Sequence, residues 1–231
     1  MIRSIVLASL VAVAAWQLGA GVSVQAKAWL GQILLERAWD RADDQSDENS
    51  EPVMPWPGAV SHPIARLRVP ALAIDHLVLE GADTPVLAWG PGMETGPNGH
   101  RMIAAHRDTH FRFLQHVQDG ERFELELEGG QTEQWEVVDQ SIVDARITQL
   151  DLGLDAEVLT LVTCYPFDSL EAGGPLRLVT SLVPVNDERL LDPGHESGLA
   201  VEESTWTVGR VTPTYSTVVS FNHRKDFYLE P

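Results

Sequence analysis

The sequence predicts a mainly β domain, folded as a closed barrel or a sandwich, because short strand patterns separated by turn residues fill its central part. Between Ile64 and Val185, apolar residues recur in short runs, and no long amphipathic helix interrupts them. Many short strands at such spacing are typical of barrels and sandwiches. The chain has 231 residues, which leaves enough for one domain with a real core after a leader and a tail are set aside.

The expected strands follow one another closely. The first, Ile64–Val69, alternates between apolar and polar residues, and the second contains Leu77 and Val78. The others are Arg101–Ala105, Arg122–Leu127, Glu133–Val138, Val158–Cys164 and Leu176–Val185. Two glycines at 129–130 predict a hairpin between the fourth and fifth strands. Short helices are expected to be minor, with one turn near Asp108–His116.

An apolar segment at the N-terminus predicts export. Residues Ile5–Val24 carry no charge and follow Arg3, as in a signal anchor or a cleavable signal peptide, and we assign residues 1–26 to this segment. Small residues at Val22–Ala26 are compatible with cleavage. The apolar length is close to the roughly 20 residues that span a bilayer, so we favour a single-pass transmembrane anchor.

The next segment, residues 27–57, is expected to be an amphipathic helix followed by an acidic linker. Apolar residues recur at helical spacing, and they are Ala28, Trp29, Ile33, Leu34, Leu35 and Trp39. This stripe lies on the membrane surface or packs on the domain. From Asp40 to Pro57 the chain is acidic and rich in proline, as linkers are.

Charge and cysteine content exclude several classes of function. The formal net charge of -18 repels phosphate backbones, so no nucleic acid partner is expected. Cys164 is the single cysteine, which excludes an intramolecular disulfide, a C-x-x-C redox pair and a multi-cysteine zinc site.

Three residues are candidates for covalent chemistry. Cys164 ends an apolar strand and borders a polar loop. A buried free cysteine is usually an inert small hydrophobe, and a nucleophilic role requires a nearby base or cation. His106 follows an apolar strand, and Arg177 lies on the strand after Cys164, where it either faces solvent or binds an oxyanion. Together they predict acyl transfer through a thioester.

We expect no metal and no cofactor. His106 and His110 match H-x-x-x-H spacing, but Arg107 stands where metalloproteases have a glutamate, and its charge repels a divalent cation. The acidic residues Asp144, Asp151 and Asp155 are interpreted as scattered surface charges rather than a calcium site.

Several motifs resemble the sortase family of cysteine transpeptidases. The segment Thr160–Cys164 (TLVTC) resembles the T-L-x-T-C signature of sortases, Arg177 follows on the next strand, and Ile103–Phe111 (IAAHRDTHF) resembles the stretch that bears the essential histidine. The likeness covers roughly Ile64–Val185 and defines an expected catalytic domain at residues 58–188. In detail the HRDTHF run and the leader are similar to the sortases of Gram-negative marine bacteria.

The resemblance implies a sortase-like closed β-barrel of about eight strands, anchored in the bacterial inner membrane with the catalytic domain on the periplasmic side. It implies cleavage of an LPxTG-like C-terminal sorting signal of exported proteins. Cys164 would attack, His106 would protonate the leaving amine, Arg177 would stabilise the oxyanion, and an amine acceptor would resolve the thioester. Asp108 is expected to orient or tune His106, and Thr163 to contact substrate or support the site.

The sequence departs from the family at two places. Ala105 replaces the glycine that many sortases have before the histidine, and residues 189–231 form a C-terminal tail of unknown role. Two other functions stay open: a different cysteine acyltransferase or peptidase, and a non-catalytic, membrane-tethered binding module.

Overall fold

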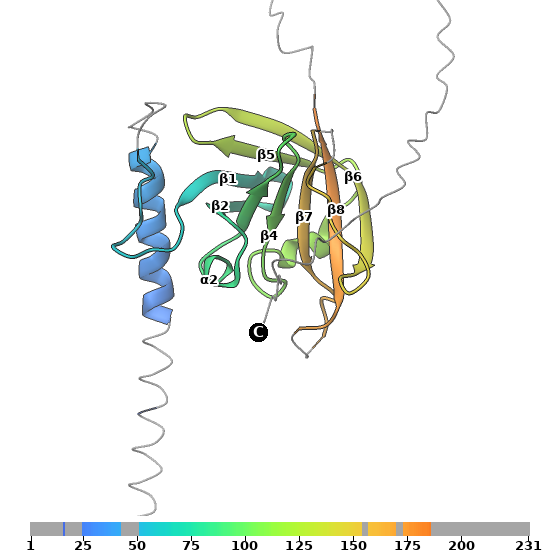
Figure 1. The fold of residues 1–231 in the computed structure, drawn as a ribbon, viewed down its shortest axis with the longest axis horizontal. Helices are drawn as coiled ribbons and strands as arrows, with labels where there is room; N and C mark the ends of the chain where they lie inside the picture. The colour runs from blue at the N-terminus through green and yellow to red at the C-terminus, as the bar shows by residue number, and fades with distance from the viewer. Residues whose placement is uncertain (1–15, 17–24, 43–50, 154–156, 170–172, 186–231) are drawn as a thin grey trace, which may run out of the picture.

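The domain is a closed barrel of eight strands (Figure 1). The computed structural model describes residues 16, 25–42, 51–153, 157–169 and 173–185. The strands are β1 Pro63–Val69, β2 Ile74–Glu80, β3 Gly92–Thr95, β4 Arg101–Ala104, β5 Arg122–Leu127, β6 Thr132–Asp144, β7 Leu159–Cys164 and β8 Leu176–Pro184. Short helices are η1 Pro70–Leu72, α2 Thr84–Leu87 and η2 Arg112–His116. The expected barrel is confirmed, and the sandwich is excluded.

The strand order around the barrel is β1-β2-β3-β4-β7-β8-β6-β5, and β5 pairs with β1 to close it. Two pairs, β2 with β3 and β4 with β7, are parallel, and the other pairs are antiparallel. A parallel pair requires a long connection. The chain between β4 and β7 therefore builds η2 and the β5–β6 hairpin before it returns to the neighbour of β4.

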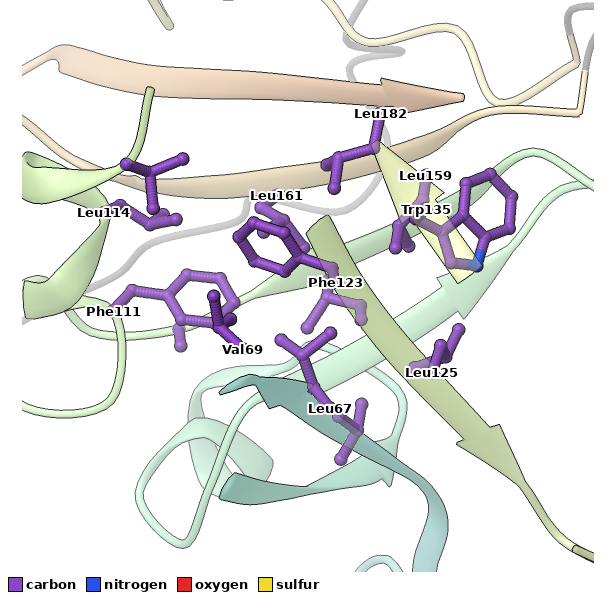
Figure 2. Close-up of a cluster of buried hydrophobic side chains, with 14 of the residues drawn as sticks. Leu67, Val69, Phe111, Leu114, Phe123, Leu125, Trp135, Leu159, Leu161 and Leu182 are labelled. Atoms are coloured by element: carbon purple, nitrogen blue, oxygen red, sulfur yellow. The ribbon is translucent and has the colours of Figure 1, made fainter. Parts of the chain in front are cut away.

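Aromatic and aliphatic side chains from every side of the barrel fill its interior (Figure 2). Trp135, Phe123 and Phe111 are fully buried, and Phe111 stands edge-on to the Phe113 ring at 5.8 Å between centroids. On β7, Leu159 and Leu161 point inward, because side chains alternate along a strand. The core therefore holds β7 rigidly up to its last residues.

The structure adds elements that the pattern did not predict. β3 contains Gly92, where a Cβ would lie 2.1 Å from the Gly81 carbonyl oxygen, so the close approach of two backbones demands glycine. β6 extends to Asp144, well past the expected end at Val138. Its register shifts between Val137 and Asp139, and this irregularity interrupts the alternation on which the sequence prediction relied.

A helix covers residues 25–42, three residues into the expected linker, and packs on the barrel beside β2 and α2 (Figure 1). The apolar stripe of this helix was expected either on the membrane surface or against the domain, and in the structure it packs against the domain. Leu35 and Trp39 contact Leu77, Leu79 and Val86, and we call these five residues the helix-side cluster. Ala28 and Trp29, at the start of the stripe, are exposed and take no part in this packing.

The end of the expected linker also has a packing partner. The Trp56 ring lies 4.7 Å from the Trp89 ring, and both rings pack against the helix-side cluster. The sequence prediction missed this contact because a lone tryptophan among prolines has no periodic pattern.

No helix within the described part of the chain is both long and apolar enough to cross a bilayer. Residues 1–24, apart from Trp16, and residues 186–231 lie outside the described residues. The predicted signal anchor and the predicted C-terminal tail both fall there, except that the anchor assignment reaches into the start of the N-terminal helix.

The docking of the N-terminal helix depends on Gly31. A Cβ at this position would lie 2.5 Å from Trp89 Cζ3, and Gln32 Nε2 donates to the Trp89 carbonyl oxygen at 2.7 Å. We expect Gly31→Leu to lower the free energy of unfolding by about 1–3 kcal/mol, the usual cost of overpacking. Leucine is a better helix former than glycine, so the loss must come from the Trp89 clash. Urea denaturation measures it.

Ala28→Leu is the matched control, because Ala28 is exposed on the same helix. If both variants keep the wild-type stability, the helix is not docked through Gly31.

Candidate active site

The register between β4 and β7 brings His106 beside Cys164. These parallel strands pair Ala104 with Val162, and Ala105 N then donates to Val162 O at 3.2 Å. His106 lies two residues beyond Ala104, and Cys164 lies two residues beyond Val162. Because residues level with each other on neighbouring strands point to the same side, this register predicts that the imidazole and the thiol lie on one face.

The register between β7 and β8 places Arg177 on the other side of the same cysteine. Cys164 and Arg177 are direct partners in this antiparallel pair. Tyr165 N donates to Leu176 O at 3.0 Å, so the Cys164 pair is of the non-hydrogen-bonded kind, in which side chains come closest. Such opposed Cβ atoms lie about 4.5–5.5 Å apart. Cys164 thus has His106 to one side and Arg177 to the other.

The three residues share the outer face of the barrel with an apolar cluster. Val162 and Ala104, which precede Cys164 and His106 by two residues, are buried there with Val179. We call the whole group the outer-face cluster, and its members are Ala82, Leu87, Met102, Ala104, Val162 and Val179, with Val143, Leu150 and Leu152 packed against it. Cys164 itself is half-buried, so its thiol is supported by this surface and still reachable.

Thr163 faces the opposite way, into the barrel. Its side chain is fully buried, and Oγ1 donates to the carbonyl oxygen of Ala105 at 2.8 Å. Of the two roles expected for Thr163, the geometry fits support of the site and not contact with substrate. The bond fixes the residue that precedes His106 to the residue that precedes Cys164.

Burial keeps His106 neutral at physiological pH. Desolvation lowers the pKa of the imidazole from its usual value of 6.5, and the charge of Asp108 opposes this effect only in part. A neutral imidazole accepts a proton from a thiol and can later return it.

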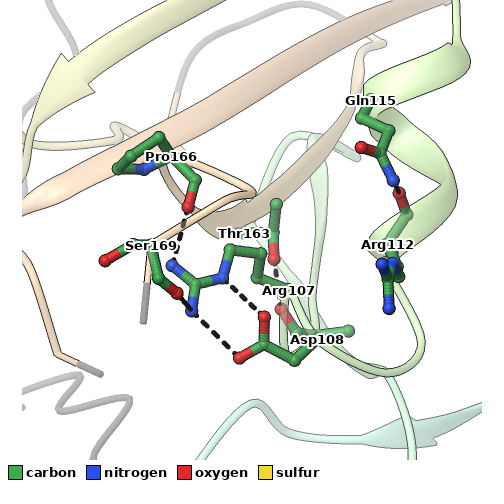
Figure 3. A network of polar contacts seen from close by, with 8 residues as sticks. Arg107, Asp108, Arg112, Gln115, Thr163, Pro166 and Ser169 are labelled. Carbon is green, nitrogen blue, oxygen red and sulfur yellow. Dashed lines mark hydrogen bonds and ion pairs between the residues drawn. The ribbon is translucent and has the colours of Figure 1, made fainter. Parts of the chain in front are cut away.

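Asp108 is engaged by Arg107 (Figure 3). Its Oδ1 accepts from Arg107 Nε at 2.7 Å and its Oδ2 from Nη2 at 3.0 Å. The expected orienting contact from Asp108 to His106 is therefore replaced by a forked ion pair, and the influence of Asp108 on His106 is that of a nearby charge. The Arg107 hydrogen bond is the largest cause of the lowered pKa of Asp108.

Arg177 is half-buried, and its Nη1 donates to the carbonyl oxygens of Gly174 and Leu176, the latter at 2.9 Å. A guanidinium carries five N–H donors, so these two bonds leave donors for a substrate oxygen. The backbone contacts hold the side chain near the end of β8 that adjoins Cys164.

Two histidines, His76 and His110, form a pair near His106. The His110 ring stands edge-on to the His76 ring at 5.3 Å, and His76 Nε2 lies 3.1 Å from the His110 carbonyl oxygen. Burial first, and then the charges of His76 and His106, lower the pKa of His110 to about 4.

Within the described residues, no group of three or more His, Cys, Asp or Glu side chains is arranged to hold a metal ion. Of the acidic residues considered for calcium, Asp144 binds Arg146 through both carboxylate oxygens, and Asp151 accepts from Gly153 N at 2.8 Å. Asp155 lies outside the described residues.

Comparison with known proteins points to one family. The family model described as the sortase domain matches residues 67–185. Sortase D of Bacillus subtilis (strain 168) is 32% identical over 119 residues, which make up 49% of this chain and 59% of that protein, so the match spans less than two thirds of the relative's length.

Two solved structures superpose on this chain. A sortase D5 transpeptidase from Clostridium perfringens superposes with a TM-score of 0.52 at 19% identity, over 68% of this chain and 99% of that one. Sortase A from Corynebacterium diphtheriae superposes with a TM-score of 0.49 at 20% identity, over 77% and 98% of the two chains. The first of these structures shares the barrel fold.

The buried histidines predict that stability falls in mild acid. Burial is the largest cause of a lowered pKa at His76, His100, His106 and His110. Below pH 6.5 the unfolded chain therefore binds more protons than the folded chain, and the free energy of unfolding should decrease as pH falls toward 4. Urea denaturation between pH 7 and pH 4 measures the slope.

His110→Phe keeps a ring against His76 and removes one of these groups, so the slope should become shallower. His116→Phe, at an exposed position of η2, is the matched control. An unchanged slope in His110→Phe would contradict the assignment.

The Thr163 bond predicts a second stability effect. Thr163→Val keeps the shape of the side chain and leaves the Ala105 carbonyl without its hydroxyl donor. We expect a loss of about 1–3 kcal/mol, the cost of an unsatisfied buried acceptor. Thr163→Ser keeps the donor and should retain most of the stability in the same denaturation experiment. Equal losses in both variants would show that packing, and not the hydrogen bond, matters at this position.

Proposed function

The chain belongs to the sortase family, and from that membership we propose that it is a cysteine transpeptidase in which Cys164, His106 and Arg177 act together. The observation that supports the proposal is the register of three neighbouring strands: Cys164 pairs with Arg177, and Cys164 and His106 each lie two residues beyond the pair of Val162 and Ala104. A buried, inert cysteine would not need a base on one side and a cation on the other.

In the first half-reaction, His106 takes the proton of the Cys164 thiol as the sulfur attacks the carbonyl carbon after the threonine of an LPxTG-like signal. The carbonyl oxygen gains a negative charge, which the guanidinium of Arg177 stabilises by donating hydrogen bonds. The C–N bond then breaks, His106 returns its proton to the leaving amine, and a thioester to Cys164 remains.

In the second half-reaction, an amine acceptor attacks the thioester. His106 accepts a proton from the amine, a new amide bond forms, and the thiol is regenerated with that proton. Water in place of the amine would give hydrolysis, so the enzyme requires an acceptor that reaches the site before water does. The lowered pKa of His106 supports both steps, since each begins with a neutral imidazole.

The apolar composition of the outer-face cluster supports the proposal that the sorting signal contains apolar residues. Val143, Leu150 and Leu152, which pack against this cluster, are only partly buried, and Val143 pairs with Arg177. Contact with such a surface stabilises aliphatic side chains such as leucine and proline. The substrates in this proposal are exported proteins with a C-terminal sorting signal.

The proposed location is the bacterial inner membrane, with one span before the described helix and the catalytic domain on the periplasmic side. The uncharged segment Ile5–Val24 and the likeness of the HRDTHF run to sortases of Gram-negative marine bacteria support this location.

The test uses the full chain in detergent with a library of LPxTG-like peptides and an amine acceptor such as triglycine. Mass spectrometry should detect a thioester on Cys164 and a product joined to the amine. Cys164→Ala should abolish both, while His106→Ala and Arg177→Ala should lower kcat/KM at least about 100-fold, as loss of a proton-transfer group or an oxyanion donor does.

The other open functions give different results. Cleavage that depends on Cys164 and ignores the amine would identify a peptidase. Peptide binding without any adduct would identify a binding module and refute the transpeptidase.

A further inference from the structure

A buried cation lies next to the proposed catalytic histidine. Arg107 has only 7% of its surface exposed. A guanidinium is costly to bury unless its N–H groups find acceptors. Arg107 finds them in the Asp108 carboxylate and in two backbone carbonyl oxygens, those of Pro166 at 2.7 Å and Ser169 at 3.1 Å (Figure 3).

These acceptors join two separate parts of the site. Asp108 belongs to the turn that follows His106, whereas Pro166 and Ser169 lie in the loop that follows Cys164, 59 and 62 residues away in sequence. Tyr165 N makes a ladder bond to β8, and the loop then leaves the sheet. Beyond that point Arg107 bonds the loop to the histidine turn.

The pairing of Arg107 distinguishes it from Arg177. Its charge is paired with a carboxylate in a forked arrangement, which fixes geometry, and the same charge also interacts with that of Cys164. Its donors Nε, Nη1 and Nη2 all have acceptors in the structure, so it is built to hold segments together.

We propose that Arg107 is a positioning residue, which holds the His106 turn and the Cys164 loop at the separation that proton transfer requires. The inference rests on the proposed function, because it assigns Arg107 to the Cys164 and His106 pair of that mechanism. A misplacement of about 1 Å between reacting groups costs about 100-fold in rate. Loss of Arg107 should therefore lower kcat by about 10–100-fold and leave KM nearly unchanged.

The matched control is Arg101, a second buried arginine from β4. It has 8% of its surface exposed, pairs with Glu133 at 2.6 Å and lies over the Trp135 ring, on contacts that do not involve the site. Arg101→Gln should lower the melting temperature without lowering kcat. Arg107→Gln should lower kcat even when compared at a temperature where both variants are folded.

A second measurement needs no substrate. Because Cys164 is the only cysteine, the rate of its alkylation by iodoacetamide can be followed from pH 5 to pH 9 in the full chain. In the wild type this profile should depend on His106, as His106→Ala will show. Arg107→Gln should reproduce the His106→Ala profile, and the double variant should add nothing further.

Arg107→Lys keeps the charge but cannot form the forked contacts, so it should resemble Arg107→Gln, and it replaces that variant if Arg107→Gln does not fold. The proposal is overturned if the Arg107 variants keep the wild-type alkylation profile and lose only stability. It is also overturned if the wild-type profile is independent of His106. If the profiles shift as expected but no peptide is cleaved, positioning by Arg107 stands and the proposed substrate is wrong.

Discussion

The parallel pairing of β4 with β7 is the interaction on which both the barrel and the candidate site depend. It joins residues 58 positions apart, so its closure must overcome the entropy of a long loop. Register matters here because a slip of one residue in β7 would turn Cys164 into the core and Thr163 outward. The bond from Thr163 Oγ1 to the Ala105 carbonyl opposes such a slip from inside the barrel.

Both faces of β7 are buried, and this explains its apolar sequence and the support that its end gives to the thiol. Leu159 and Leu161 fill the core, while Val162 lies in the outer-face cluster. A strand covered on both sides is nearly continuous in apolar residues. Cys164 is the first residue at which this cover opens, since it is half-buried where the residues before it are buried. The thiol is thus held by a rigid strand and exposed at its end, which is where access and support coincide.

Much of this arrangement was predictable from the sequence, and what was missed has physical causes. Alternation and apolar runs predicted the strands that follow a regular pleat, and motif resemblance selected Cys164, His106 and Arg177. β3 and the far half of β6 were missed because glycine at a backbone contact and a register shift leave no periodic signal. The contacts of Arg107 were not predictable from spacing, because two of its acceptors are backbone carbonyls that any residue supplies. An arginine followed by an aspartate after a strand end is the available signal, and the sequence pattern alone does not say that the two side chains pair with each other.

The two arginines near Cys164 differ in what they bind, and this difference divides their roles. Arg107 is almost fully buried and donates hydrogen bonds to Asp108 and to the loop after Cys164. Arg177 is half-buried and directs Nη1 to backbone carbonyls, which are neutral. The hydrogen bonds of Arg177 go to neutral acceptors, and its charge, which acts on Asp144 nearby, can also act on an anion that appears during the reaction. The residue on the strand opposite the nucleophile is therefore suited to the oxyanion, and the residue after the histidine is suited to hold the geometry in which that oxyanion forms.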